Sequence, residues 1–175
     1  MAQRGIEVRE FYNQYGPPKY AARTVRKLIR AVPDRYLGGL ECVVLTNQSG
    51  LPRRFRLGKV TSRKRRVPQT YVIGRYHRAT RTSQAWIELF VDKLSVAGGD
   101  SLVPFKREAV YGYVLFHEIG HHIHATIAPE HREKEDVADD WRRKLMLGFF
   151  RKEYWYLWPF RTPIRKLLKA WARTL

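Results

Sequence analysis

The stretch from Pro104 to Ile127 constrains the fold of this 175-residue chain more than any other segment. Apolar residues recur in it at helical spacing, Pro104 suits the first turn of a helix, and Pro129 follows its end. Large apolar side chains favour burial of this helix: Val110, Val114, Leu115 and Phe116. We therefore expect a buried helix that carries the segment HEIGH, from His117 to His121.

The HEIGH segment has the residue types and spacing of a metal site. Residues four apart on a helix lie on one face about one turn apart, so the imidazoles of His117 and His121 can reach one cation. Glu118 lies beside them, where its carboxylate can take a proton from a metal-bound water and later deliver it. The motif predicts a Zn²⁺ site with two histidine ligands and Glu118 as the catalytic base.

A catalytic zinc site takes a third protein ligand, and the sequence offers one on the next predicted helix, about residues 132–150. The metzincin pattern would need histidine at position 127, where this chain has Ile127, so that class is excluded. The segment EDVAD predicts Glu135 as the third ligand. Asp139 lies one turn further on, where it can accept the ring N–H of a zinc-bound histidine.

These residues carry a resemblance to a known group of enzymes. His117, Glu118 and His121, followed by an E-x-x-x-D segment, resemble the gluzincin zinc metallopeptidases, to which thermolysin belongs. The compact form, HEIGHHIH and then E-x-x-A-D-x-W, looks particularly like the ImmA/IrrE-type and integral-membrane CaaX-type peptidases. The resemblance covers residues 105–141 and implies a zincin fold and peptide-bond hydrolysis by Glu118-assisted attack of zinc-bound water.

The rest of the chain departs from these families. It has no apolar run that matches the membrane spans of CaaX-type enzymes, no recognisable helix-turn-helix or sensor segment, and far fewer residues than thermolysin. We therefore expect residues 1–175 to form a single, minimal zinc metalloendopeptidase domain, with its metal-site helices at about 104–150.

Other residues near the motif leave alternatives open. His131 is a rival third ligand, as in Spartan-type zincins, and Glu133 and Asp136 are further candidates because the register of the helix is uncertain by a residue or two. His124 lies on the same helical stripe as the ligands and is expected to pack beside them or support them, whereas His122 is expected at the surface. Candidates for stabilising a negatively charged intermediate are Tyr154, Tyr156 and His131.

The hydrophobic pattern predicts an α+β fold. The expected order is an N-terminal helix at 21–32, a small mixed sheet of three to four strands, the active-site helix, the glutamate-bearing helix and a C-terminal helix at about 160–175. Strands are expected at Glu41–Asn47, Thr70–Arg78 and Ala85–Leu94, with a weak strand and an exposed basic loop within Gln48–Val67.

The segment Ala85–Leu94 has a predicted role because it precedes the metal-site helix. Both faces carry large apolar side chains, but one also carries Glu88 and Asp92, which suits the edge of a sheet. The zincin resemblance implies that this strand borders the cleft and that a peptide can add to it. The expected substrate-binding residues are Trp86, Ile87, Glu88, Leu89 and Phe90.

The chain is strongly basic. Its 34 Lys and Arg against 16 Asp and Glu give a net charge of +18, and residues 1–80 hold 18 of the basic residues but 4 of the acidic ones. The positive electrostatic potential of such a chain favours binding of polyanions, either nucleic acid or an anionic membrane surface. The residues expected to bind them form the run RKRR in a predicted loop: Arg63, Lys64, Arg65 and Arg66.

A second class of function also fits the sequence: a basic nucleic-acid- or membrane-surface-binding module with a structural zinc site. Aromatic residues near Arg151 and Lys152 can stack bases, lie at a lipid interface or pack in the core. They are Phe149, Phe150, Tyr154, Trp155, Tyr156, Trp158 and Phe160. Glu118 favours hydrolysis, because a structural site needs no carboxylate beside its ligands.

The location expected from the sequence is the cytoplasm. A single cysteine, Cys42, excludes an intramolecular disulfide framework and a cysteine-rich metal cluster, and it fits a reducing compartment. The first residues carry charges where a secretion signal needs an apolar run, and no apolar run approaches the roughly 18 residues of a membrane span.

Overall fold

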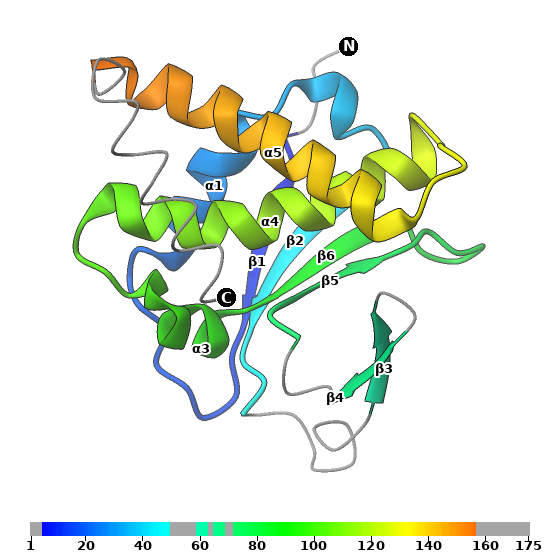
Figure 1. Cartoon of the computed structure of the whole chain (residues 1–175). Coiled ribbons are helices and arrows are strands. Elements are labelled where there is room, and N and C mark those ends of the chain that lie inside the picture. Colours follow the sequence, from blue (N-terminus) through cyan, green and yellow to red (C-terminus); the bar gives the residue numbers. More distant parts are fainter. Residues whose placement is uncertain (1–4, 50–58, 63–64, 69–71, 157–175) are drawn as a thin grey trace.

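The computed structural model describes residues 5–49, 59–62, 65–68 and 72–156, and of 59–62 and 65–68 it describes the backbone. It has an α+β architecture in which helices pack against a four-stranded mixed sheet (Figure 1). The α+β class and the small mixed sheet expected from the sequence are thereby confirmed. The C-terminal helix expected at about 160–175 lies outside the described residues.

The main sheet has the strand order β1-β2-β6-β5. Its strands are β1 (Glu7–Phe11), β2 (Leu40–Thr46), β5 (Gly74–His77) and β6 (Ala85–Phe90). The first, second and sixth strands run parallel, and β5 is antiparallel to β6. A separate antiparallel pair consists of β3 (Lys59–Ser62) and β4 (Arg65–Pro68). Among the described strands, β5 therefore has one neighbour and forms an edge.

One face of the sheet forms the hydrophobic core. Val43 aligns with Ile87 and Leu45 with Leu89, and all four side chains are fully buried. Because side chains alternate along a strand, the residues that precede and follow these four in each strand lie on the opposite face. That face carries more polar groups, including the stacked rings of His77 and Trp86.

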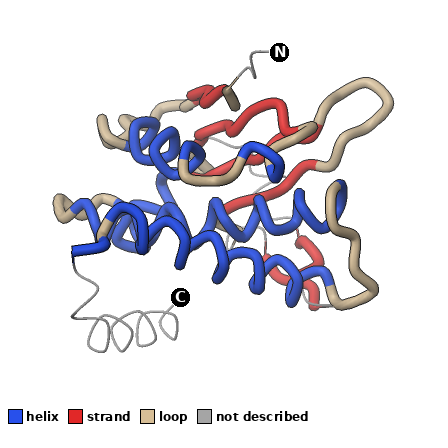
Figure 2. Tube along the Cα trace, turned by 90° about the horizontal axis from the view of Figure 1, so that it is seen from above, coloured by secondary structure: helices blue, strands red, loops and turns tan. Residues whose placement is uncertain are grey.

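The helices cover the core face. They are α1 (Ala21–Arg30), the short α3 (Val91–Leu94), α4 (Pro104–Thr126) and α5 (Lys134–Glu153). One-turn 3-10 and π segments occur at Asp34–Tyr36 and Ser95–Gly99. Both α1 and α4 contribute to the core cluster with the sheet, and α5 packs on α4. Figure 2 shows the two long helices beside each other. No helix in the described ranges is long and apolar enough to cross a membrane.

A buried ion pair links α1 to the first half of α4. Glu108 is 4% exposed, and Lys27 of α1 donates to both of its carboxylate oxygens at 2.9 and 3.1 Å. The Tyr154 hydroxyl donates to the same carboxylate at 2.8 Å. Because these partners satisfy the charge, Glu108 can be buried at the point where α1, α4 and the end of α5 meet.

The structure corrects the prediction for the strand before α4. The strand ends at Phe90 instead of Leu94, because the Asp92 carboxylate accepts the backbone N–H groups of Gln48 and Ser49, both at 3.0 Å, and the chain turns into α3. This strand, β6, is also not at the edge: β2 pairs with one side of it and β5 with the other. The predicted substrate-binding residues 86–90 therefore lie on an interior strand.

Two further segments differ from the prediction. Arg65 and Arg66 lie in β4 and not in a loop, because the segment folds back on β3 as an antiparallel pair. The strand β1 was not expected, because three of its five residues are charged. Its position at the other edge of the sheet explains this composition, since charged side chains suit edge strands.

The two metal-motif helices approach each other closely at Gly120. A Cβ atom built on this residue would lie 2.7 Å from the carbonyl oxygen and 2.8 Å from the Cα of Ala138 in α5. These are backbone atoms, so a rotamer change cannot relieve the contact. The absence of a side chain at Gly120 therefore lets α5 lie directly against the HEIGH segment of α4.

We expect Gly120→Ala to destabilise the fold by about 3 kcal/mol, at the upper end of typical overpacking effects, because the two helices must move apart. Gly148→Ala is the matched control: it is also in a helix, but its Cβ would meet nothing within 4 Å. That change should stabilise the protein by about 0.5–1 kcal/mol through helix propensity. Urea unfolding of both variants measures the difference, and equal stabilities would contradict the assigned close approach.

Candidate metal centre

Two histidines of α4 and one glutamate of α5 form a group that can hold a metal ion. One ligand atom from each of His117, His121 and Glu135 lies within 4.8 Å of the others. The two carboxylate oxygens of Glu135 lie 3.4 Å from His117 Nε2 and 3.7 Å from His121 Nε2. The three side chains are about one-fifth exposed, so the group is open to solvent on one side.

Asp139 orients the first of these histidines. Its Oδ1 lies 2.9 Å from His117 Nδ1 and 3.0 Å from Arg142 Nη1. Since Nδ1 faces this carboxylate, Nε2 is the ring nitrogen that points toward His121 and Glu135. A metal-binding histidine usually directs the ring nitrogen that does not bind the metal to a carboxylate in this way. The contact selects the tautomer of His117 with a free lone pair on Nε2.

The two histidines differ in their affinity for protons. Burial lowers the pKa of His117, but its hydrogen bonds with Asp139 and Glu135 outweigh burial and raise it to about 9. Burial and the adjacent positive charge of His117 lower the pKa of His121. A cation at Nε2 therefore competes with a proton on His117, while His121 already presents a neutral ring.

Glu118 is placed differently from the three candidate ligands. Its side chain is 7% exposed, and burial raises the pKa of its carboxyl to about 7, although the charge of His117 and a hydrogen bond from the Tyr76 backbone lower it. Gly74 of β5 lies directly over it, because a Cβ there would be 3.1 Å from Glu118 Oε1. A carboxyl group with a pKa near neutral can both accept and release a proton at physiological pH.

The donor set fits zinc. Two imidazole nitrogens and one carboxylate are a ligand combination found in catalytic zinc sites, which keep a further position open. The carboxylate behind His117 supplies the outer support that such ligands need. Glu118 is buried beside the group without belonging to it. The side chains present are therefore compatible with a Zn²⁺ ion that retains an open coordination position.

The other predicted candidates lie outside this group. His131, Glu133 and Asp136 are exposed. His124 is 9% exposed, and its Nε2 donates to the Glu130 carbonyl at 2.8 Å, which ties the end of α4 to the loop before α5. The Tyr154 hydroxyl donates to Glu108. Glu108 precedes His117 by nine residues, which is about 14 Å along the helix, so Tyr154 is held away from the metal group. Tyr156 is 54% exposed.

His122 was expected at the surface, and this prediction is wrong. The residue is fully buried, and its Nε2–H donates to the Gly38 carbonyl at 3.0 Å. Its Nδ1 then accepts the Tyr76 hydroxyl at 3.2 Å. A helix with the sheet on one side and a second helix on another buries more than one stripe, so a histidine adjacent to a metal ligand can also be enclosed.

Three residues at the site were not found from the sequence: Gly74, Tyr76 and Arg142. The first two belong to β5, which passes over Glu118, and the third pairs with Asp139 from one turn further along α5. The only available signal was Gly74, a glycine inside a predicted strand, which marks a close approach of the backbone. Arg142 also stacks on Tyr113, with its guanidinium carbon 3.9 Å from the ring centroid.

The basic run expected to bind polyanions cannot be placed in full. Arg63 and Lys64 lie outside the described residues, and Arg65 and Arg66 are described by their backbone in β4.

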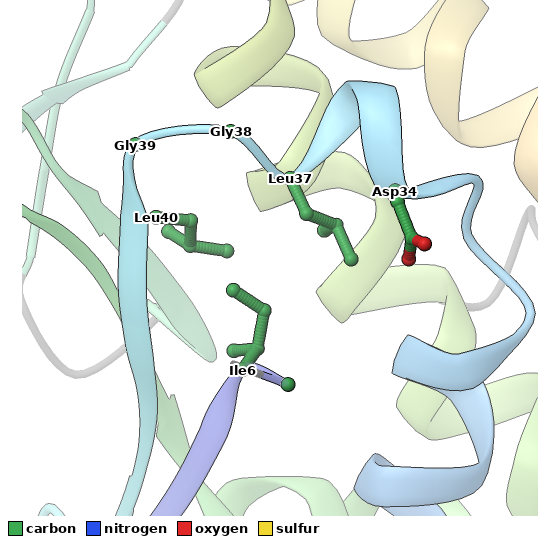
Figure 3. A pocket seen from close by; sticks show the side chains of 7 residues that line it. Ile6, Asp34, Leu37, Gly38, Gly39 and Leu40 are labelled. Carbon is green, nitrogen blue, oxygen red and sulfur yellow. The ribbon is translucent and has the colours of Figure 1, made fainter. Parts of the chain in front are cut away.

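A pocket elsewhere on the molecule is not part of the metal centre. It encloses about 290 Å³. Figure 3 shows that it lies beside the start of β2. Its lining is largely apolar or glycine, with Asp34 as its single charged side chain, and it contains no histidine.

The third ligand can be tested by comparing two variants. We expect Glu135→Ala to weaken zinc binding by at least about 100-fold, beyond the 10–100-fold typical of outer-sphere changes, because a ligand oxygen is lost. Asp139→Asn should fall within that lower range, and His131→Ala should have little effect because this ring is exposed outside the group. Competition with a chromogenic chelator measures all three. A larger loss in His131→Ala would move the third ligand to that histidine.

Comparison with known proteins adds no further assignment: the chain matches no protein-family profile, no curated protein and no solved structure.

Proposed function

We propose that this protein is a zinc-dependent metallopeptidase with a gluzincin-type site in a zincin-like domain. The observation that carries the proposal is the position of Glu118, a buried carboxyl with a pKa near 7 adjacent to the group formed by His117, His121 and Glu135. A purely structural zinc site has no use for a carboxyl that is not a ligand. Hydrolysis requires one, because water must lose a proton as it attacks.

The proposed reaction divides the work between the ion and the side chains. A bound Zn²⁺ would polarise the scissile carbonyl and lower the pKa of a water molecule. Glu118 accepts the proton of the attacking water and delivers it to the departing amine. Asp139 holds His117 so that its Nε2 faces Glu135, and burial raises the pKa of the Glu118 carboxyl to about 7.

The substrate is proposed to bind along β5. Strand addition requires an edge, and among the described strands of the main sheet β5 is the edge beside the metal group. The lack of a side chain at Gly74 lets this strand pass against Glu118. An extended peptide paired with residues 74–77 would therefore run close to the catalytic carboxyl, which the interior strand β6 does not permit.

Metal analysis and an unbiased peptide library test the proposal together. Purified protein should contain about one zinc ion per chain, as a single site of this ligand set predicts. It should cleave members of the library, lose this activity in a chelator and regain it with added Zn²⁺. Stoichiometric zinc with no cleavage of any peptide would favour the structural-site alternative over the enzyme.

A further inference from the structure

One helix face outside the metal centre concentrates positive charge. Four basic residues follow each other at spacings of four, three and four in the turn before α1 and along it: Lys19, Arg23, Arg26 and Arg30. This spacing places side chains on one face of a helix. All four are exposed, and we call them the α1 stripe.

Among the described residues, the α1 stripe has no counterions. In the described part of the chain, none of its four side chains takes part in an ion pair, a hydrogen bond or a ring contact. Lys27 on the same helix differs, because it is paired with Glu108 and Glu153. Four uncompensated cations in a row raise the local potential, and a partner with several negative charges lowers it.

We infer that the α1 stripe binds the phosphate backbone of a nucleic acid. From Lys19 to Arg30 the stripe extends over about 16 Å at 1.5 Å per residue, which spans about five base pairs at 3.4 Å each. Three of its four residues are arginines, whose planar guanidinium groups match phosphate geometry in a bidentate manner. Contacts to phosphate oxygens carry no sequence information, so binding through them is independent of the base sequence.

The remainder of α1 argues against a membrane as the partner. A helix that lies on a lipid surface inserts apolar side chains beside its basic ones. The apolar residues of α1 are all turned into the core, with exposures of 0–7%: Ala21, Ala22, Val25, Leu28 and Ile29. Helix α1 therefore offers charge without an apolar surface to insert.

The stripe and the metal centre can act independently. Helix α1 is linked to α4 at Glu108, and the metal group begins nine residues later, about 14 Å along the helix. A nucleic acid bound to the stripe would contact a different helix from the one that carries His117 and His121, and it would hold the protein near other molecules bound to the same polymer. This binding does not depend on the proposed peptidase activity.

Fluorescence anisotropy with a labelled, random-sequence DNA duplex of about 20 base pairs tests the inference, with titrations of the full chain at several salt concentrations. If the stripe neutralises four phosphates, it should contribute about −3.6 to the slope of log K against log salt concentration, since each phosphate contributes about −0.9. Replacing the four stripe residues by Gln should remove that contribution. Zinc content and the circular dichroism spectrum should stay unchanged, because the changes are exposed and Gln is a good helix former.

The matched control replaces Arg78, Arg81, Lys134 and Lys144 by Gln; these are exposed basic residues outside the α1 stripe, so the net charge changes by the same amount. The inference is supported if the control variant keeps most of the salt dependence and the stripe variant loses it. It is overturned if both variants weaken equally, since net charge would then suffice, or if the control alone loses binding. Binding to anionic vesicles without binding to the duplex, or binding to neither at ~50 mM salt, also overturns it.

Discussion

His117→Ala and His121→Ala are each expected to reduce the zinc content from about one ion per chain to near zero, because two remaining protein donors do not hold a stable tetrahedral site. The distances make both histidines necessary: Glu135 lies between the two Nε2 atoms, 3.4 Å from one and 3.7 Å from the other. Removing His117 also leaves Asp139 without the ring that it orients. Elemental analysis after dialysis against a weak chelator measures the effect.

His77→Ala provides the control for this experiment. His77 is also a partly exposed histidine, but it lies on the opposite face of the sheet, where it stacks on Trp86 with ring centroids 3.7 Å apart. This variant should keep its zinc. If the parent protein holds no stoichiometric transition metal at neutral pH, or if both α4 variants keep it, the group is not a metal site and the enzyme proposal fails with it.

Glu118→Gln is expected to keep the fold and the zinc ion but to lower the rate of peptide hydrolysis by about 10²–10⁴-fold, the usual contribution of a general base. The amide has nearly the same shape as the carboxyl but cannot accept the proton of water. Burial disfavours the charged form of Glu118, as its raised pKa shows, so the neutral replacement should not reduce stability. Single-turnover cleavage of a library-derived peptide, together with zinc content and thermal unfolding, separates these effects.

Glu88→Gln is the matched control for the catalytic residue. Glu88 is a partly buried glutamate on the polar face of the sheet, where its carboxylate lies 3.3 Å from His77 Nε2. Its replacement should leave turnover close to that of the parent protein. Equal rates in the parent and in Glu118→Gln would show that Glu118 is not the base, whatever the metal content.

Part of this protein could be predicted from the sequence because the relevant interactions are local. The helix that carries HEIGH begins at Pro104 and ends at Thr126, close to the predicted limits. The i, i+4 geometry that brings His117 and His121 together follows from the helix alone. The strand β2 and the helix α1 were similarly predictable, because each displays its own periodicity and its own stop signals.

The remaining features depended on contacts between distant segments. The sequence left Glu135 in competition with His131, Glu133 and Asp136, and the tertiary structure brings Glu135 to the histidines because α5 lies against Gly120. The edge of the sheet belongs to β5 and not to β6, since strand order is set by long-range pairing that no local pattern records. His122 is buried for the same reason: its partners, Gly38 and Tyr76, are 84 and 46 residues away in the chain.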